Sequence, residues 1–470
     1  MGNSIVIDHD YVRTYIESHL DRRQVNKIQH AFPSPRFWTE TEIPVAQMLE
    51  DRHKLQARGL GSPINLYMGV PYCIQTEPGK CGYCLFPVEA YTGNRDLDLY
   101  FEYLKREVAM YRDTGLQDLP LGAVFFGGGT SNLYKAEKYH ELMDLVRSMF
   151  PIIPDYVDIT LEGIPQLFTR EKIQAIKESG MNRISMGVQQ VNEQLNSFSG
   201  RKQKTQHVIQ SLEWAKEFGL AANIDLIFGW PQQTVKTMVE DLETVISWGV
   251  YDITHYELNV GGPTDFALNR FHELPSTLSN LEMYKVARDL LLSHGYKQVT
   301  AYNWRKPGNP FSRPYEEGVT HRFDNMDTLG LGYAALTFFS DVALEEGHSW
   351  SFINWRNLAE YKARIDAGKF PSESGFRHER EDFMISLIWR NLFGMELERK
   401  KFQDSFGVDI YEYFEVVLKV LEEFQFITVT PEIIKLVGDG PFYTPLIQTL
   451  LAEKRYQTLR EKLVLEAQTT

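Results

Sequence analysis

An alternation of expected strands and helices, repeated six times, constrains the fold of this chain more than any other feature. From about residue 64 to residue 260, short runs rich in β-branched and aromatic residues alternate with amphipathic segments. Strands separated by helices of about ten to sixteen residues form βαβ units, and such units build a parallel sheet. The six expected strands cover residues 64–70, 122–127, 156–163, 182–188, 221–230 and 252–260.

This pattern predicts the fold class α/β, with a partial (β/α)6 barrel of the TIM-like type. In such barrels the chemistry takes place at the carboxyl ends of the strands. We predict three parts: a helical N-terminal extension over residues 1–60, the barrel with additions over residues 61–375, and a cap domain over residues 376–470. Helices followed by a short hairpin are typical of a small winged-helix-like C-terminal domain.

Composition and charge narrow the class of function. The 470 residues are 43% apolar and 24% charged, which is ordinary for a globular protein. A net charge of −14, from 49 basic and 63 acidic residues, argues against a primary role on nucleic acid. The sequence shows neither a signal-peptide core nor a run of 18 apolar residues, so we expect a cytoplasmic protein without a membrane span.

The three cysteines of the chain lie within twelve residues, in the loop after the first expected strand. Cys73, Cys81 and Cys84 have the spacing C-x7-C-x2-C. A disulfide framework needs cysteines in pairs. Three thiolates from one loop can bind three irons of a [4Fe–4S] cluster, whereas structural clusters usually take four cysteines. The fourth iron is then open to a further ligand, as in open catalytic metal sites.

In radical chemistry the open iron binds the amino and carboxylate groups of S-adenosylmethionine, and the protein orients the cofactor. We therefore predict a radical S-adenosylmethionine enzyme. Two alternatives stay open at this point. One is a zinc site of three cysteines completed by a distant histidine, because C-x2-C is also zinc spacing. The other is a set of three unrelated reduced cysteines.

Several motifs, in the same order and at similar spacing, resemble the oxygen-independent coproporphyrinogen III oxidase family of radical S-adenosylmethionine enzymes. The resemblance extends over about residues 62–470. It implies a [4Fe–4S] cluster and one or two molecules of S-adenosylmethionine as cofactors. The motifs are NLYMGVPYC, VFFGGGTSNL, ITLEGIP, ISMGVQQVN, SGR, NIDLIFGWPQQT and, near the C-terminus, RHEREDFMISLIWRNLFGMEL and FGVDIYEYF.

The resemblance also implies roles for single residues at the expected strand ends. A glycine motif contacts the methionyl end of the cofactor, and a guanidinium suits the cofactor carboxylate because it can bond in a bidentate way. Each of these residue types also has a purely structural explanation. The glycines could form a tight turn, a lone acid or arginine could belong to a surface ion pair, and the aromatic rings could pack in the core. The implied residues are Gly127, Gly128, Gly129 and Thr130 at the methionyl end, Glu162 and Gln189 as further polar contacts, Arg201 at the carboxylate, Asp225 at the ribose hydroxyls, and Tyr67, Tyr83 and Phe86 around the cluster and adenine.

The sequence departs from the family pattern in two places. The family usually has C-x3-C-x2-C, and this chain has four more residues between its first two cysteines. A longer loop can still wrap a cluster, because the cost of loop closure grows slowly with length. The family usually carries a histidine near its reaction centre where this chain has Gly69. Standard porphyrin decarboxylation is therefore an alternative here rather than the first expectation.

We expect an enzyme that reductively cleaves S-adenosylmethionine to a 5′-deoxyadenosyl radical and modifies a small organic substrate. The expected reaction is methyl or methylene transfer from a second S-adenosylmethionine, or anaerobic tetrapyrrole or haem chemistry. The expected electron donor is a flavodoxin or ferredoxin. The alternatives are a coproporphyrinogen III oxidative decarboxylase and a non-catalytic haem-binding chaperone, for which His255, His321 and His348 are candidate axial ligands. The basic loop at residues 303–318 is either a contact for substrate carboxylates or solvated surface.

Overall fold

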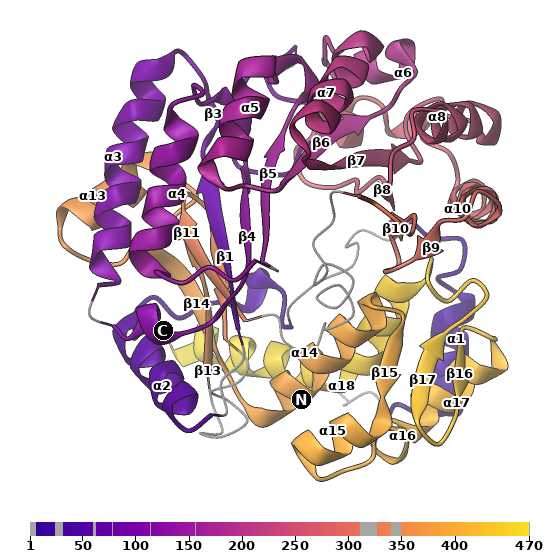
Figure 1. Cartoon of the computed structure of the whole chain (residues 1–470). Coiled ribbons are helices and arrows are strands. Elements are labelled where there is room, and N and C mark those ends of the chain that lie inside the picture. Colours follow the sequence, from indigo (N-terminus) through magenta and orange to yellow (C-terminus); the bar gives the residue numbers. More distant parts are fainter. Residues whose placement is uncertain are drawn as a thin grey trace.

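Six parallel strands form the centre of the molecule, as the sequence predicts. The computed structural model describes residues 6–23, 32–59, 63–77, 79–112, 114–155, 157–310, 327–339 and 349–469. The six strands are neighbours in chain order and curve around an interior, which Figure 1 shows. They are β1 (Ile64–Val70), β4 (Leu121–Gly128), β5 (Asp158–Gly163), β6 (Arg183–Gln189), β7 (Ala221–Phe228) and β8 (Asp252–Glu257).

Helices cover the outer face of this sheet (Figure 1). Thr169 and Thr234 cap the amino ends of two of them by accepting a backbone hydrogen bond, and Gly180 ends the first of these two in a left-handed conformation. Among the described residues, no helix combines the length and the apolar character needed to cross a membrane. The covering helices are α3 (Asn94–Met110), α4 (Lys138–Met149), α5 (Arg170–Ser179), α7 (Thr205–Phe218), α8 (Val235–Ser247) and α10 (Thr277–Ser293).

Further strands extend the sheet on both sides, and sequence patterns did not predict them. The sheet has twelve strands in the order β14-β13-β12-β11-β1-β4-β5-β6-β7-β8-β10-β9. Strand β11 is parallel to β1, whereas β12 to β14 and both β9 and β10 are antiparallel to their neighbours. The added strands are β9 (Lys297–Gln298), β10 (Asn303–Arg305), β11 (Thr328–Gly332), β12 (Leu336–Phe338), β13 (Ser349–Asn354) and β14 (Ser372–His378), with α13 (Leu358–Asp366) between the last two.

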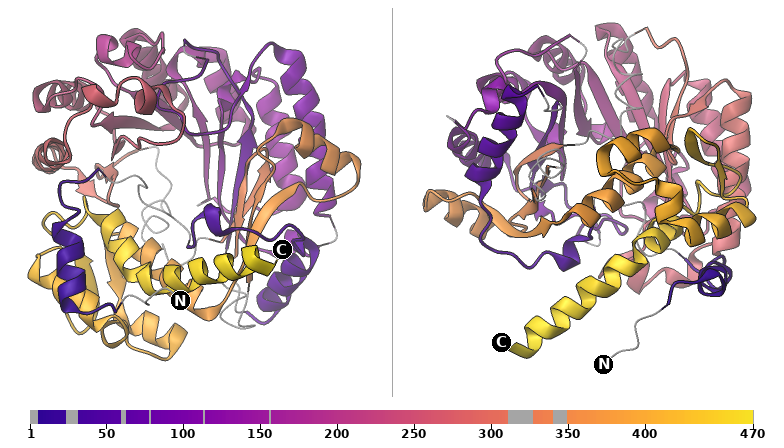
Figure 2. Two further views of the ribbon diagram at one scale, coloured as in Figure 1. Left: turned by 180° about the vertical axis from the view of Figure 1, so that it is seen from behind. Right: turned by 90° about the horizontal axis from the view of Figure 1, so that it is seen from below.

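The C-terminal region has the expected helices and small hairpin. Its strands β15 (Glu396–Glu398), β17 (Ile433–Leu436) and β16 (Ile427–Val429) form a separate sheet. The long helix α18 (Thr444–Thr469) extends away from this sheet in Figure 2. The remaining helices are α14 (Arg380–Phe393), α15 (Arg399–Phe406), α16 (Ile410–Tyr413) and α17 (Glu415–Glu423).

The N-terminal segment is helical and joins distant parts of the chain. Helix α1 (His9–Glu17) contacts α17, where His9 and Arg13 both bind Glu423. Helix α2 (Val45–Ala57) carries Arg52, whose Nε lies 3.1 Å from Asp327 Oδ2 just before β11. The expected boundary between residues 375 and 376 falls inside β14, so β14 spans the two expected parts; the domain boundaries stay predictions.

Candidate functional site

The cysteine loop begins at the carboxyl end of β1. Cys73 lies in the short strand β2 (Tyr72–Cys73), which pairs with β3 (Glu89–Ala90) after the loop returns. The amide of Cys84 donates to the carbonyl of Cys81 at 2.9 Å, which forms a tight turn around the second and third cysteines. All three cysteines are free thiols and partly buried. The loop therefore presents three separate sulfur ligands from one rim of the barrel.

The residues before Arg201 hold this lengthened loop in place. The amide of Gly82 donates to the carbonyl of Ser199 at 3.0 Å. Gly200 has a φ of +81°, and a Cβ atom there would lie 2.5 Å from the carbonyl oxygen of Glu77. Glycine is required where the backbone takes this conformation and approaches another segment so closely. The SGR motif therefore places Arg201 beside the cysteines through backbone contacts.

A cavity of about 330 Å³ lies beneath the loop, at the carboxyl ends of the barrel strands. All of the predicted site residues except Gly127, Tyr67 and Asp225 line it. Strands far apart in the sequence supply them, as the barrel architecture requires. The predicted residues in the lining are Cys73, Cys81, Tyr83, Cys84, Phe86, Gly128, Gly129, Thr130, Glu162, Gln189 and Arg201.

Three predicted residues lie outside the lining: Gly127, which is part of β4, Tyr67 and Asp225. Tyr67 stacks on Phe125 with ring centroids 6.2 Å apart, next to Glu162. Asp225 lies on β7 and raises the pKa of Glu162 through charge repulsion. Tyr67 and Asp225 therefore both lie near Glu162, which lines the cavity, and their assignment to adenine and ribose stays a prediction.

The glycine motif has a packing role as well as a place in the cavity wall. The amide of Gly129 donates to the carbonyl of Val70 at 2.7 Å, and a Cβ atom on Gly129 would lie 2.3 Å from the carbonyl oxygen of Tyr72. Gly128 has a φ of +103°. The hydroxyl of Thr130 then lies 3.1 Å from the sulfur of Cys73. The motif thus fixes the backbone that leads to the first cysteine.

Arg201 is the buried cation of the cavity, with 7% of its surface exposed. Its guanidinium donates to the hydroxyl of Tyr83 at 3.0 Å and to the carbonyl of Gly187 at 2.6 Å. Burial lowers the pKa of Arg201, but Tyr83 and the thiol of Cys81 outweigh burial and raise it overall. The guanidinium therefore stays charged and can bind an anionic group.

Glu162 and the thiols are in the opposite electrostatic situation, because burial disfavours their charged forms. Burial raises the pKa of Glu162 to about 8, Asp225 adds to the rise, and Arg201 opposes it. Burial also raises the pKa of Cys81 to about 11 and raises the pKa of Cys84. Positive charge brought in by a ligand would favour the ionised form of each group.

The far wall of the cavity contains the predicted residue Gln189 and two residues, Tyr256 and Asn259, that the sequence did not single out. Gln189 has a φ of +68° at a register shift between β6 and β7, and its Oε1 accepts from the hydroxyl of Tyr256 at 3.4 Å. A non-glycine residue in this conformation is uncommon and is often found at functional sites. Tyr256, near the carboxyl end of β8, and Asn259, just after β8, both line the cavity. Their position at a strand end is the signal that could have identified them.

The donor set of the cavity fits a [4Fe–4S] cluster with S-adenosylmethionine. Three thiols face one side, and a buried cation is available for a carboxylate. Asn259 Oδ1 is buried and lacks a hydrogen-bond partner among the described residues, so it can accept from an amine of the ligand. Within the same residues, no three His, Cys, Asp or Glu side chains converge closely enough to hold a single metal ion. This finding is compatible with a cluster, because a cluster requires only one thiolate for each of three irons rather than three ligands on one metal ion.

Gly69 lies near the carboxyl end of β1, beside the parallel strand β11. It pairs with Gly332, and a Cβ atom on Gly69 would lie 2.6 Å from the carbonyl oxygen of Tyr333. The hydroxyl of Tyr100 donates to the carbonyl of Gly69 and accepts from the amide of Tyr333 at 3.0 Å. A histidine at this position would require the end of β11 to move.

The structure also locates the other candidate residues of the sequence. His255 is 3% exposed and packs on Phe228, and burial lowers its pKa to about 3. His321 and His348 lie outside the described residues. In the basic loop, Arg305 Nε lies 2.6 Å from Asp252 Oδ1, at the amino end of β8 and away from the cysteines. Arg305 therefore contacts a carboxylate of this chain.

Together, this fold and this site define a class of proteins: a partial barrel with a three-cysteine loop after its first strand is the architecture of radical S-adenosylmethionine proteins. Residues 75–245 match the Radical SAM superfamily. The solved structure of coproporphyrinogen III oxidase (HemN) from Escherichia coli, described there as a radical SAM enzyme, has the same fold. The TM-score is 0.75 at 22% identity, covering 90% of this chain and 96% of that chain.

Sequence relatives narrow the class further. The heme chaperone HemW of Bacillus subtilis is 31% identical over 368 residues, which are 76% of this chain and 90% of that protein. The oxygen-independent coproporphyrinogen III oxidase of Helicobacter pylori is 24% identical over 382 residues, covering 77% and 79%. This chain belongs to the family of oxygen-independent coproporphyrinogen III oxidases and heme chaperone HemW. The expected family is confirmed, and its cofactors are a [4Fe–4S] cluster and S-adenosylmethionine.

Proposed function

We propose that Cys73, Cys81 and Cys84 hold the cluster and that the 330 Å³ cavity binds S-adenosylmethionine for reductive cleavage. When bound, the reduced cluster supplies the electron that splits the sulfonium and gives a 5′-deoxyadenosyl radical, which acts on a small organic substrate. The observation that carries the proposal is the convergence of the predicted residues from five separate segments on one cavity.

The residues of this chain have separate tasks in that proposal. Arg201 binds the cofactor carboxylate, because it is a charged donor buried beside the thiols. Glu162 accepts from amine or hydroxyl groups of the ligand and loses its proton when positive charge enters. The aromatic rings of Tyr83, Trp230 and Phe266 pack together behind the loop and exclude water from this wall.

The experiment measures 5′-deoxyadenosine formed by the anaerobically reconstituted protein with S-adenosylmethionine and a chemical reductant. We expect formation by the wild-type protein and none by Cys73→Ala, Cys81→Ala or Cys84→Ala, each with diminished iron and acid-labile sulfide. Gln75→Ala is the matched control, since Gln75 is an exposed residue of the same loop and does not line the 330 Å³ cavity. Full cleavage by any cysteine variant would contradict the ligand assignment.

The electron is expected to come from a flavodoxin or ferredoxin. A second cavity of about 510 Å³ also adjoins the cysteine loop, and Cys73 and Cys81 line both cavities. Gln75, Gly79 and Lys80, which lie between the first two cysteines, line this second cavity. Reduction of the cluster by either protein, measured by loss of its visible absorption, supports this partner class; reduction only by small chemical reductants contradicts it.

A haem-binding chaperone is the second candidate function. It is favoured by the 31% identity to heme chaperone HemW, which extends over 90% of that protein. Haem titration of the protein, followed by its absorption spectrum, tests this candidate. Tight haem uptake without 5′-deoxyadenosine formation would favour the chaperone over the enzyme. His255 is buried in the protein core, so His255→Ala is expected to leave haem uptake unchanged.

The fate of labelled S-adenosylmethionine distinguishes the finer reactions. Label in the product indicates methyl or methylene transfer, and release of carbon dioxide from coproporphyrinogen III indicates oxidative decarboxylation. The resemblance associates decarboxylation with a histidine where this chain has Gly69, and a Cβ atom there would lie 2.6 Å from the carbonyl oxygen of Tyr333. Oxidative decarboxylation of coproporphyrinogen III stays the alternative reaction, because relatives named for it are 24% identical to this chain. Carbon dioxide release from coproporphyrinogen III would support this alternative.

A further inference from the structure

The Asp225 carboxylate is oriented by neighbours before any ligand binds. One of its oxygens accepts from the side-chain amide of Asn223 at 2.7 Å, and the other accepts from the hydroxyl of Ser185 at 3.2 Å. A carboxylate has about four acceptor positions. The hydroxyl of Thr254 is a third donor to Asp225. The carboxylate therefore keeps capacity for a further donor, such as a ribose hydroxyl.

Asn223 is the centre of this arrangement. It is 2% exposed and lies two residues before Asp225 on β7, so the two side chains point to the same face of the sheet. Its amide nitrogen lies 2.9 Å from the hydroxyl oxygen of Ser185 and 3.1 Å from that of Thr254. Asn223, Ser185 and Asp225 thus form a closed triangle of hydrogen bonds.

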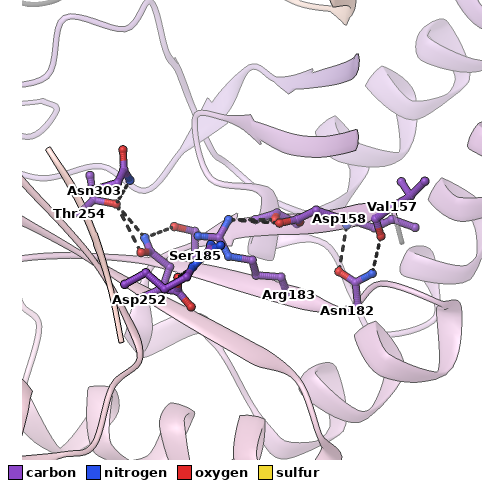
Figure 3. A network of polar contacts seen from close by, with 12 residues as sticks. Val157, Asp158, Asn182, Arg183, Ser185, Asp252, Thr254 and Asn303 are labelled. Atoms are coloured by element: carbon purple, nitrogen blue, oxygen red, sulfur yellow. Dashed lines mark hydrogen bonds and ion pairs between the residues drawn. The ribbon is translucent and has the colours of Figure 1, made fainter. Parts of the chain in front are cut away.

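The hydrogen bonds continue from this triangle toward the C-terminal region, and Figure 3 shows part of the network. The amide of Asn303 on β10 donates to the hydroxyl of Thr254 at 3.1 Å. The hydroxyl of Thr300 donates to Asn303 at 2.7 Å. In the same turn, the backbone amide of Ala301 donates at 3.0 Å to the carbonyl of Phe393, the last residue of α14. The end of α14 therefore contacts the turn that holds Asn303.

We propose that Asn223 is a positioning residue that holds the Asp225 carboxylate toward the ribose hydroxyls of S-adenosylmethionine, with Thr254 and Asn303 fixing Asn223. The inference rests on the proposed function, because it deepens the role of Asp225 in that site. Burial raises the pKa of Asp225, and hydrogen bonds from Thr254, Asn223 and Ser185 oppose the rise. The donors therefore favour the ionised carboxylate, which accepts hydroxyl hydrogen bonds most strongly.

A buried amide elsewhere in the barrel provides the matched control. Asn182 is 6% exposed, donates to the carbonyl of Val157 at 2.7 Å and accepts from the amide of Ile159 at 3.0 Å. Figure 3 shows Asn182 beside Val157, at the other end of the drawn network from Thr254 and Asn303. Its removal is expected to cost stability without changing affinity for the cofactor.

The test is a double-mutant cycle on the cluster-loaded protein, with the dissociation constant for S-adenosylmethionine measured by calorimetry. We expect Asn223→Ala to weaken binding about tenfold and Asp225→Asn to weaken it at least as much. Asn223→Ala added to Asp225→Asn should change affinity by less than about twofold, because the two residues act as a unit. Asn303→Ala is the second variant. We expect it to weaken binding of S-adenosylmethionine less than Asn223→Ala does, and to have no effect on binding when it is added to Asp225→Asn.

A ligand lacking a ribose hydroxyl gives an independent readout. For the 2′-deoxy analogue of S-adenosylmethionine, wild-type and Asn223→Ala proteins should bind with more similar affinity than they bind the parent compound. Additive losses in the cycle, or an unchanged affinity in Asp225→Asn, would overturn the role of Asn223 while the proposed function stands. A wild-type protein that holds a cluster but does not bind S-adenosylmethionine would overturn both.

Discussion

At the scale of single residues, the site combines one permanent cation, Arg201, with a carboxyl group and thiol groups whose neutral forms are favoured by burial. Arg201 is charged and anchored by Tyr83 and Gly187. Glu162 and Cys81 have raised pKa values because they are buried. A ligand that carries both a carboxylate and positive groups complements this contrast, and S-adenosylmethionine has both.

Arg201→Ala should weaken S-adenosylmethionine binding by about 10- to 100-fold, because hydrogen bonds to a charged group contribute about 1.5–3 kcal/mol. The cluster should still assemble, since no cysteine is changed. Titration of the reconstituted variant, with iron content measured alongside, checks both statements. Tyr83→Phe removes only the hydroxyl that anchors Arg201 and should have a smaller effect. Unchanged affinity in Arg201→Ala would remove this residue from the site.

The raised pKa of Glu162 predicts that the folding stability of the protein depends on pH. Its pKa in the folded protein is about 8, above the usual value of 4.5. Between these values the folded protein keeps a proton that the unfolded chain has released, so this group lowers folding stability as pH rises. Glu162→Gln removes that effect and should raise the melting temperature of the cluster-free protein more at pH 8 than at pH 5.

The control for this prediction is the exposed residue Glu213, whose change to Gln should leave the pH dependence as in the wild-type protein. Equal effects of Glu162→Gln at both pH values would contradict the assignment of a raised pKa to Glu162. The same variant should bind S-adenosylmethionine more weakly, since it cannot become negatively charged.

At the scale of elements, the glycine motif after β4 sets the position of the first cysteine. Gly129→Ala would place a Cβ atom 2.3 Å from the carbonyl oxygen of Tyr72, so the backbone must move. Overpacking of this kind typically costs about 1–3 kcal/mol. We expect a lower melting temperature and a lower iron content after reconstitution.

Gly79→Ala is the matched control, because a Cβ atom on Gly79 has no neighbour within 4 Å. Gly79 lies in the cysteine loop itself, so the control also tests whether the loop tolerates substitution in general. Equal losses of iron in Gly79→Ala and Gly129→Ala would contradict the specific role of the motif.

Strand and helix periodicity predicted the six parallel strands, because each is a local apolar run between amphipathic helices. It did not predict β11, since the run TLGLGYAALTFF is rich in glycine and its pairing with β1 joins residues far apart in sequence. The cysteine spacing indicated the cluster, and the resemblance supplied the polar residues. Tyr256 and Asn223 were missed because their contacts arise only when neighbouring strands come together.

At the scale of the whole molecule, the N-terminal segment and the barrel depend on each other. Arg52 and Asp327 form an ion pair with both side chains fully buried, between α2 and the start of β11. Removal of one partner from a buried pair leaves an uncompensated charge and costs about 3–5 kcal/mol. Asp327→Ala should therefore lower the melting temperature strongly. Asp404→Ala is the control: Asp404 forms an exposed ion pair with Lys400, so its removal should have a small effect. Similar melting temperatures for the two variants would contradict a structural role for α2.

The central claim concerns three cysteine thiolates that leave one iron of the cluster free for S-adenosylmethionine. The most direct measurement is the electron paramagnetic resonance spectrum of the reduced, reconstituted protein before and after S-adenosylmethionine is added. The account predicts a [4Fe–4S]⁺ signal whose g values change on addition of the cofactor, because the cofactor binds the free iron. A protein that assembles no cluster, or a signal that S-adenosylmethionine leaves unchanged, would contradict it.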